Sequence, residues 1–136
     1  MIILDASVVI KWFSEEEYTE KALELRERIR YGEEQVIEPD LLLYELANAL
    51  KHNQHFEVQD VRDALTSVFD MNIDIVTPLP DIIDVAIKLA FEHTITVYDA
   101  FYIALAQETG LILITADKKL YERVPSLEFV KFIGEL

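Results

Sequence analysis

Short apolar runs alternate along the chain with longer segments in which apolar residues recur every three or four positions. The short runs predict five buried strands: IILD (2–5), QVIEP (35–39), IDIVTP (73–78), LILIT (111–115) and LEFVKFI (127–133). Strands that are continuously apolar, instead of alternating with polar residues, are typical of a parallel sheet covered on both faces. The pattern therefore predicts an α/β fold.

The longer segments predict a helix after each strand and further helices between them. Ser14 and Glu17 have the spacing of a capping box for a helix that Gly32 would end, Asp40 can cap the next long helix, and Gly110 ends a later one. The expected helices cover residues 6–13, 14–31, 41–54, 58–70, 79–93, 98–110 and 118–124. Strands and helices that alternate in this way favour parallel pairing of the strands.

The chain has 136 residues and no internal repeat, low-complexity run or linker rich in proline and glycine, so we expect a single domain over residues 1–136. Hydrophobic residues make up 51% of it, which is enough for a packed core. No cysteine is present, which excludes disulfides and thiolate metal sites and fits a cytoplasmic protein. No apolar stretch reaches the ~18 to 20 residues of a membrane span, so we expect no membrane partner.

The net charge is strongly negative. The chain has 12 Lys and Arg against 26 Asp and Glu, which gives 12 − 26 = −14. A general nucleic-acid binder needs a basic surface to neutralise phosphates, and this composition argues against one. Any action on nucleic acid must therefore depend on a local site.

Four acids occupy positions where a parallel sheet collects its ligands. Asp5 ends the first strand, Asp117 follows the LILIT strand, Asp99 begins the helix before that strand, and Glu45 lies one turn into the helix after the second strand. Ligands bind outside the carboxyl ends of parallel strands. We therefore expect all four side chains to meet at one edge.

Each acid also has a purely structural explanation. Asp5 and Asp117 could cap the helices that follow them, and Asp99 could be an acid favoured by the dipole of its helix. Glu45 shares a flank of its helix with Asn48, and an exposed flank would explain it. Together the four like charges would repel one another unless a cation lay among them.

A metal ion would supply that cation. The ligands available are all oxygen atoms, from the four carboxylates and the nearby hydroxyls of Ser7 and Thr115, and such a set favours Mg²⁺ or Mn²⁺. The three histidines, His52, His55 and His93, form no H-E-x-x-H motif and are interpreted as surface or core residues. Carboxylate-bound Mg²⁺ typically acts on phosphate oxygens, so phosphodiester or phosphoryl chemistry is expected.

Three segments carry a resemblance to a known family: ILDASVVIKWF (3–13), LLLYELANAL (41–50) and YDAFYIALAQETGLILITADKKL (98–120). The chain resembles PIN-domain ribonucleases, and more closely the VapC-type toxins of VapBC toxin-antitoxin pairs. The resemblance implies a PIN-like fold, a five-stranded parallel sheet sandwiched between helices. It places the family's acidic metal-binding quartet on Asp5, Glu45, Asp99 and Asp117, and the hydroxyl that precedes the last acid on Thr115.

The resemblance also implies an activity and partners. It implies a metal-dependent endoribonuclease that hydrolyses RNA with a metal-activated water, with Mg²⁺ or Mn²⁺ as cofactor, a homodimer, and an antitoxin protein that blocks the site. Residues near the acids could contact the RNA, namely Lys11, Lys51, Lys118, Lys119, Ser7 and Asn48; each lysine could equally be an ordinary surface residue. A cluster of apolar residues in the first two helices suggests a surface for a partner: Val8, Val9, Trp12, Phe13 and Tyr18.

Three other interpretations remain to be weighed. A receiver-like signalling domain also has an acidic Mg²⁺ pocket, but it requires a second acid after the first strand and a Lys at the end of its last, whereas Ala6 follows Asp5 and Lys131 lies inside the last strand. A PIN-fold binding module without activity is opposed by the complete quartet. A nucleotide-binding Rossmann domain lacks its phosphate loop, because only three glycines are present.

Overall fold

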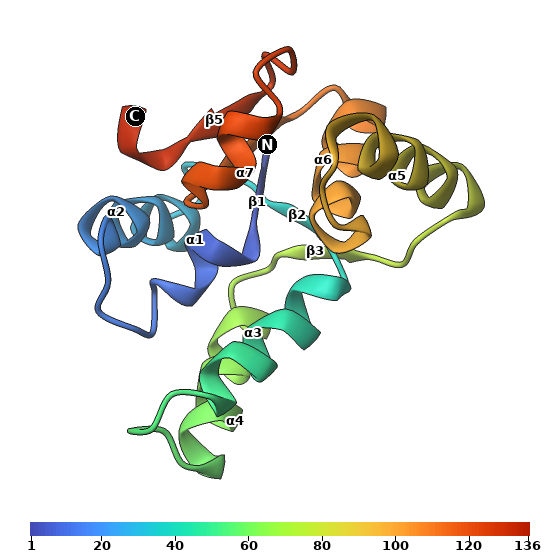
Figure 1. Ribbon diagram of the computed structural model, residues 1–136. Coiled ribbons are helices and arrows are strands. Elements are labelled where there is room, and N and C mark those ends of the chain that lie inside the picture. The colour runs from blue at the N-terminus through green and yellow to red at the C-terminus, as the bar shows by residue number, and fades with distance from the viewer.

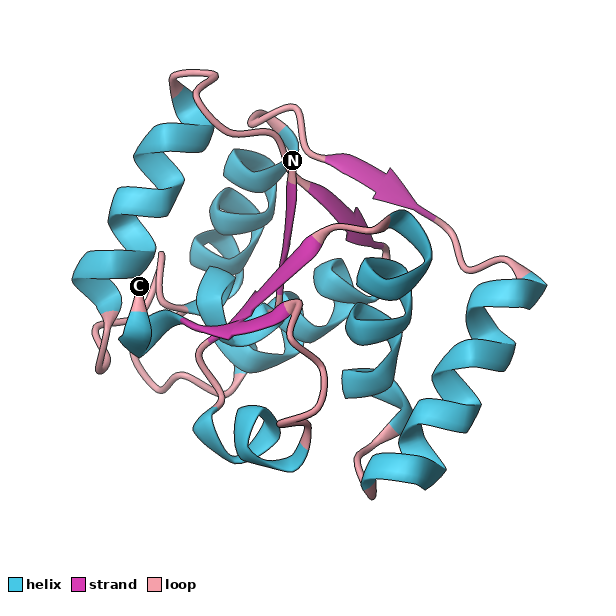
Figure 2. Ribbon diagram, turned by 90° about the horizontal axis from the view of Figure 1, so that it is seen from above, coloured by secondary structure: helices cyan, strands magenta, loops and turns pink.

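Strands cross the middle of the computed structural model, which describes residues 1–136, and helices lie on both sides of them (Figures 1 and 2). The strands are β1 (Ile2–Leu4), β2 (Ile37–Pro39), β3 (Asp74–Val76), β4 (Ile112–Thr115) and β5 (Val130–Phe132). The helices are α1 (Ala6–Ile10), α2 (Thr19–Arg30), α3 (Leu41–Lys51), α4 (Val58–Phe69), α5 (Pro80–His93), α6 (Val97–Thr109) and α7 (Lys118–Arg123), with a final 3₁₀ turn, η1 (Ile133–Glu135). The α/β class and all five strands agree with the sequence patterns.

All strand pairs are parallel, but they do not form one continuous sheet. β1, β4 and β5 form a three-stranded sheet in the order β1-β4-β5, and β2 pairs with β3. A single isolated bridge, between Ile2 and Val36, joins the two parts. The expectation of one five-stranded sheet is therefore wrong in this detail, because the observed strands are divided into two parts between β1 and β2.

The side chain of Glu38 explains the division. The backbone N–H of Ile2 donates to the carbonyl of Gln35 at 2.9 Å, as in a regular ladder. Two residues later the N–H of Leu4 points to the same neighbour, yet it donates to Oε1 of Glu38 at 2.6 Å. A buried carboxyl thus takes the place of a backbone carbonyl and ends the pairing of β1 with β2 just before Asp5.

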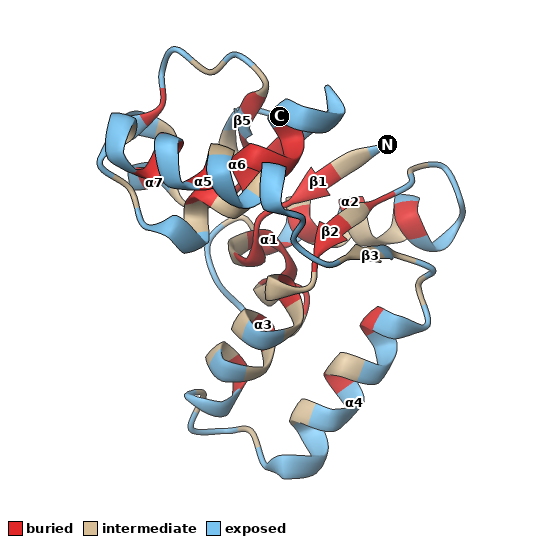
Figure 3. Cartoon of the chain, turned by 90° about the vertical axis from the view of Figure 1, so that its right-hand side faces the viewer, coloured by how far each residue is buried: buried red, intermediate tan, exposed pale blue.

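The core lies where β1, α1, α3, α6 and β4 meet. Figure 3 shows buried residues concentrated in β1, β2, α1 and α6, while β3 has none and α4 is mostly exposed. In α6 every residue from Tyr102 to Ala106 is buried, so this helix has no polar face there. On α3 the buried residues Leu42, Leu46 and Leu50 recur every four positions and leave Glu45 on the flank.

The expected capping box of Ser14 and Glu17 is wrong. α2 begins only at Thr19, after Tyr18 in a left-handed conformation (φ 67°) and without a side-chain cap. The hydroxyl of Thr19 accepts from the N–H of Glu16 at 2.9 Å and donates to the carbonyl of Ser14 at 3.2 Å. These bonds hold residues 14–18 as a turn, which the capping pattern could not distinguish from a helix start.

Other element ends differ in detail. α3 ends at Lys51 instead of residue 54, the last strand is shortened to Val130–Phe132, and Asp40 makes no side-chain cap to α3. The helix ends expected at Gly32 and Gly110 are confirmed, since both glycines follow a helix with φ of 74° and 70°.

The apolar residues of the first two helices do not form a partner surface. Val8, Val9 and Trp12 are buried in the core, and Phe13 and Tyr18 are partly buried against it. One small domain therefore covers this apolar surface by itself, and the basis on which it suggested a partner is wrong. None of the helices is both long and apolar enough to cross a membrane.

Candidate active site

Four acids from four elements line one hollow of about 300 Å³. Asp5 directly follows β1, Asp117 precedes α7 after β4, Glu45 lies on α3 and Asp99 lies in the first turn of α6. The hollow is at the carboxyl ends of β1 and β4. The structure thus brings together the four acids that the sequence predicted to meet at one edge of the sheet.

Asp5 is buried and held from two sides. Its Oδ2 accepts hydrogen bonds from the hydroxyls of Ser7, at 2.6 Å, and Thr115, at 2.9 Å. Its side chain makes no capping bond to α1, although Asp5 occupies the cap position. Burial raises the pKa of Asp5 in spite of these two hydrogen bonds, and the charge of Asp117 raises it further.

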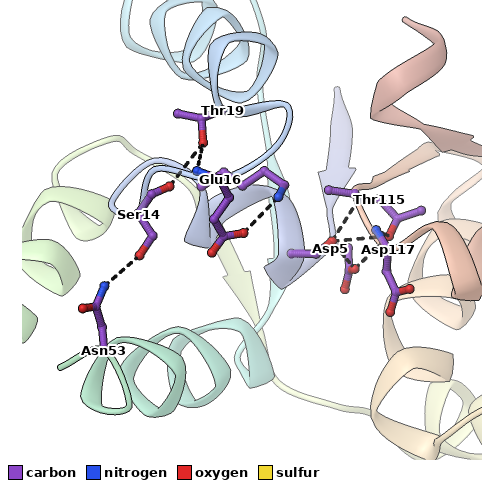
Figure 4. A network of polar contacts seen from close by, with 10 residues as sticks. Asp5, Ser14, Glu16, Thr19, Asn53, Thr115 and Asp117 are labelled. Atoms are coloured by element: carbon purple, nitrogen blue, oxygen red, sulfur yellow. Dashed lines mark hydrogen bonds and ion pairs between the residues drawn. The ribbon is translucent and has the colours of Figure 1, made fainter.

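Thr115 and Ser7 link β1 to the loop after β4. The Thr115 hydroxyl also accepts from the N–H of Asp117 at 3.0 Å, and the Ser7 hydroxyl accepts from the N–H of Ala116 at 2.9 Å. Figure 4 shows Asp5, Thr115 and Asp117 facing one another at this point. Asp117 itself caps α7, because its Oδ1 accepts from the N–H of Leu120 at 3.1 Å.

Glu45 is held by a buried tyrosine. The hydroxyl of Tyr102 on α6 donates to Oε1 of Glu45 at 2.7 Å, and Tyr102 is fully buried. Burial raises the pKa of Tyr102, so the hydroxyl keeps its proton and remains a donor. Burial also raises the pKa of Glu45, more than the bond from Tyr102 lowers it.

The pKa of Asp99 reflects the burial and the crowding of negative charge in the hollow. Burial, together with the charges of Asp5 and Asp117, raises its pKa to about 6. The helix start that carries it is fixed by Thr96, whose hydroxyl accepts from the N–H of Asp99 at 3.0 Å. None of the four acids forms an ion pair with a Lys or Arg of the chain: the pairs present involve other residues.

The donor set suits a hard divalent cation. The acids of the hollow offer only oxygen atoms, neighbouring acids raise the pKa of Asp5, Glu45 and Asp99, and none of the four forms an ion pair with a Lys or Arg. No three of these carboxylates are already gathered closely enough to hold a metal as they stand. The fit to a metal therefore lies in the chemistry and the charge of these oxygen ligands.

Comparison with known proteins shows the family of the chain. The family model described as the PIN domain matches residues 2–126. The chain belongs to the PIN-domain family. A curated relative, Ribonuclease VapC3 of Pyrobaculum aerophilum, is 32% identical over 93% of this chain and 96% of its own length.

Solved structures share the PIN fold. A toxin-antitoxin complex from Klebsiella pneumoniae contains a chain with a TM-score of 0.67 and 24% identity, which covers 96% of this chain and 95% of that chain. VapC20 of Mycobacterium tuberculosis, described as a toxin that cleaves the sarcin-ricin loop, has a TM-score of 0.71 and 14% identity, covering 91% and 95%. At these identities the likeness shows the fold.

The residues expected to contact a substrate are placed unevenly in this PIN domain. Ser7 and Asn48 line the acidic hollow, and Lys11 lines a second hollow beside it. Lys51, Lys118 and Lys119 are exposed and line neither, although the last two directly follow Asp117. Lys11 is buried and paired with Glu16, so it is not the ordinary surface lysine that the sequence allowed.

Two residues that support the site escaped the sequence patterns. Glu38 is fully buried beside Leu4, and its acidic side chain inside the apolar run QVIEP was a signal that could have been read. Tyr102 offered no such signal, because one more aromatic residue in an apolar helix is ordinary.

The receiver-like alternative loses its remaining support. A receiver domain requires a lysine that reaches the acids from the end of the last strand. Here Lys131 lies in the middle of β5 and is exposed. The family match is to the PIN domain along nearly the whole chain. A PIN domain without activity remains the alternative that the cleavage assay below decides.

Proposed function

We propose that this PIN domain is a metal-dependent endoribonuclease, the toxin of a type II toxin-antitoxin pair, and that it hydrolyses RNA phosphodiester bonds. The observation that carries the proposal is the hollow lined by Asp5, Glu45, Asp99 and Asp117, four carboxylates from separate elements with no cation of the chain among them. The ribonuclease relative supports the same activity.

Asp5, Glu45, Asp99 and Asp117 would hold Mg²⁺ or Mn²⁺. When bound, such an ion offsets negative charge on the phosphate and on the leaving oxygen and lowers the pKa of water. Without the ion the same carboxylates repel an RNA phosphate, so the acids themselves make substrate binding depend on the cation.

The surrounding residues fix the carboxylates before any substrate arrives. Ser7 and Thr115 orient Asp5, Tyr102 orients Glu45, and the cap to Leu120 orients Asp117. Such outer hydrogen bonds set the direction of a ligand and are typical of metal sites. The Ser7 hydroxyl in the hollow donates to Asp5 and accepts from the N–H of Ala116, so it serves to position the acid, and the proposed hydrolysis by water needs no side-chain nucleophile.

Cleavage of RNA in the presence and absence of metal tests the proposal. The purified protein should cut RNA with Mg²⁺ or Mn²⁺ and should stop when EDTA is in excess. Asp99→Asn should remove most of the activity with the fold unchanged by circular dichroism. Undiminished cleavage in EDTA would rule out the metal-dependent mechanism.

A matched control separates the site from a general effect of charge. Asp81 lies in the first turn of α5, as Asp99 lies in the first turn of α6, but it is exposed and outside the hollow. Asp81→Asn should cleave RNA at the wild-type rate. A folded wild-type protein that cuts no RNA under any metal condition would favour the inactive PIN-fold module.

We further propose a cognate antitoxin as partner and the cytoplasm as the place of action. The structural neighbour from a toxin-antitoxin complex supports such a partner. Because the chain carries a net charge of −14, the segment that covers the site should be basic. Co-expression with the product of the neighbouring reading frame should give a complex in which RNA cleavage is lost.

A homodimer is also proposed, but through a different surface from the one the sequence suggested. Exposed apolar residues recur every four positions from the cap of α5 along the helix: Leu79, which precedes it, then Ile83, Ile87 and Phe91. Phe91 is 85% exposed. A stripe of this kind on one helix is typical of a contact with another protein.

A further inference from the structure

A second hollow opens beside the four acids. It measures about 560 Å³, within the ~300 to 1,000 Å³ typical of small-molecule sites. It shares four lining residues with the acidic hollow, namely Ser7, Ile10, Ala49 and Asp117, so the two form one continuous depression. An RNA strand with one phosphate at the acids can therefore continue into it.

Lys11 is the only Lys or Arg among the residues that line the two hollows. Its side chain is only 9% exposed, and its Nζ lies 2.9 Å from Oε2 of Glu16. A cation buried to this degree requires a counter-ion. Glu16 provides it at present, but the Glu16 side chain is itself 43% exposed and can leave for solvent.

Glu16 sits on a turn that is anchored independently of Lys11. The hydroxyl of Thr19 holds the N–H of Glu16, and the amide of Asn53 donates to the Ser14 hydroxyl at 3.3 Å (Figure 4). The backbone of the turn therefore stays in place if the Glu16 carboxylate rotates away. Ser14 and Asn53 line the same hollow and offer polar groups of the kind that contact single-stranded RNA.

We infer that this second hollow is a phosphate subsite for the RNA strand, in which Lys11 binds a phosphate next to the scissile one and Glu16 occupies the place of that phosphate in the free protein. The inference rests on the proposed ribonuclease function. Exchange of one anion for another keeps the buried ammonium paired throughout, so substrate binding involves no stage with an uncompensated charge. Lysine binds phosphate as a point charge, which suits contact with any RNA sequence.

Neutralising Glu16 tests the subsite, because it should strengthen RNA binding instead of weakening it. Glu16→Gln keeps Lys11 and removes its competitor, so a short labelled single-stranded RNA should bind about two- to fivefold more tightly. Lys11→Met should weaken binding about tenfold. Affinity is measured by fluorescence anisotropy on the full chain with Ca²⁺ in place of Mg²⁺, and a gel confirms that the RNA stays intact.

Two neighbours provide matched controls. Glu15 and Glu17 lie on the same turn, are exposed, and make no ion pair with Lys11, so Glu15→Gln and Glu17→Gln change the net charge equally. The gain from Glu16→Gln should exceed both, and it should disappear in the double variant Lys11→Met/Glu16→Gln. The polar residues of the second hollow are tested in the same way. Asn53→Ala should weaken RNA binding, whereas Gln54→Ala, which removes an exposed amide at the next position, should not.

The outcomes separate the subsite from the proposed function. If the wild type cuts RNA with Mg²⁺ but Glu16→Gln binds no more tightly than Glu15→Gln and Glu17→Gln, the subsite is wrong and the nuclease stands. If the wild type neither binds nor cuts RNA, the proposed function fails and the subsite with it. Should Lys11→Met fail to fold, the comparison among the three Glu variants still decides.

Discussion

Glu38 places a carboxylic acid in the interior of the protein with one oxygen bonded and the other not. Oε1 accepts from Leu4, whereas Oε2 is buried without a hydrogen-bond partner. Burial raises the pKa of Glu38 well above its ordinary value, and the charge of Asp5 raises it further. The folded protein therefore holds the proton of Glu38 to a higher pH than the unfolded chain does.

The first prediction concerns the stability of Glu38→Gln. Since the folded pKa of Glu38 is raised, the folded state holds its proton while the unfolded state loses it, and stability falls as the pH rises above the ordinary Glu value. The amide cannot ionise, so Glu38→Gln should match the wild type near pH 4 and exceed it at pH 7 to 8 in urea unfolding. An identical pH dependence of the two proteins would show that Glu38 does not titrate in this way.

Glu38→Ala is the companion variant. It leaves a cavity and an unpaired N–H at Leu4, so it should lower the free energy of unfolding by about 2 to 4 kcal/mol near pH 4. The loss should be smaller at pH 7 to 8, where the wild type has itself lost stability through Glu38 and alanine has no group to ionise.

A second prediction concerns Tyr102, which acts through Glu45. Tyr102→Phe removes the 2.7 Å hydrogen bond and little packing, so unfolding should change by only about 1 kcal/mol. A freed Glu45 is a less well-directed ligand, and Mn²⁺ affinity measured by calorimetry should fall about 10-fold or more. Tyr98→Phe, at an exposed position of the same helix, is the control and should bind metal as the wild type does. Equal affinity in both variants would leave Tyr102 a packing residue only.

Among the elements, the placement of the acids could be predicted and the division of the sheet could not. Asp5 and Asp117 follow strands whose apolar runs are plain in the sequence, and carboxyl ends of parallel strands meet at one edge whatever the rest of the fold does. Pairing of β1 with β2 depends instead on the Glu38 side chain reaching Leu4, a contact between residues 34 positions apart. Local patterns carry no information on such a contact.

The predicted start of α2 was wrong for a related reason. Ser14 and Glu17 satisfy the spacing of a capping box, but Thr19 offers a hydroxyl to the same turn and holds the N–H of Glu16. A helix start and a turn are therefore both locally possible there, and the hydrogen bond from the Asn53 amide to the Ser14 hydroxyl favours the turn. The same turn carries Glu16 against Lys11, which is why Lys11 could not be recognised from the sequence as a buried residue.

The third prediction separates two roles of Asp117 at the start of α7. A cap needs only an acceptor for the N–H of Leu120, so Asp117→Asn should unfold like the wild type, whereas Asp117→Ala should lose about 1 kcal/mol. A metal ligand needs the charge, so both variants should lose most RNA cleavage. Wild-type cleavage by a folded Asp117→Asn protein at limiting Mg²⁺ would leave Asp117 as a cap alone.

At the scale of the whole molecule, the distribution of charge matters more than its sum. The net charge of −14 makes the surface repel RNA, yet the depression at the carboxyl ends of the strands combines the four acids proposed to bind metal with one buried ammonium. Binding of a divalent cation there both neutralises the acids and makes the local field more favourable to phosphate. A protein of this composition can therefore act on RNA only at the site, which limits unproductive binding elsewhere.

The last prediction concerns assembly through α5. Ile87 and Phe91 lie one turn apart on its exposed apolar stripe, and burying them against a second copy would remove apolar surface from water. Light scattering at micromolar concentration should give the mass of a dimer for the wild type and of a monomer for Phe91→Glu. Lys88→Glu is the control, because Lys88 is exposed next to Ile87 but pairs with Asp84 away from the stripe, and this change alters the charge more than Phe91→Glu does. A dimer that survives Phe91→Glu would place the interface elsewhere, and a monomeric wild type would contradict the dimer itself. If Lys88→Glu also gave a monomer, general charge repulsion, and not the apolar stripe, would control assembly.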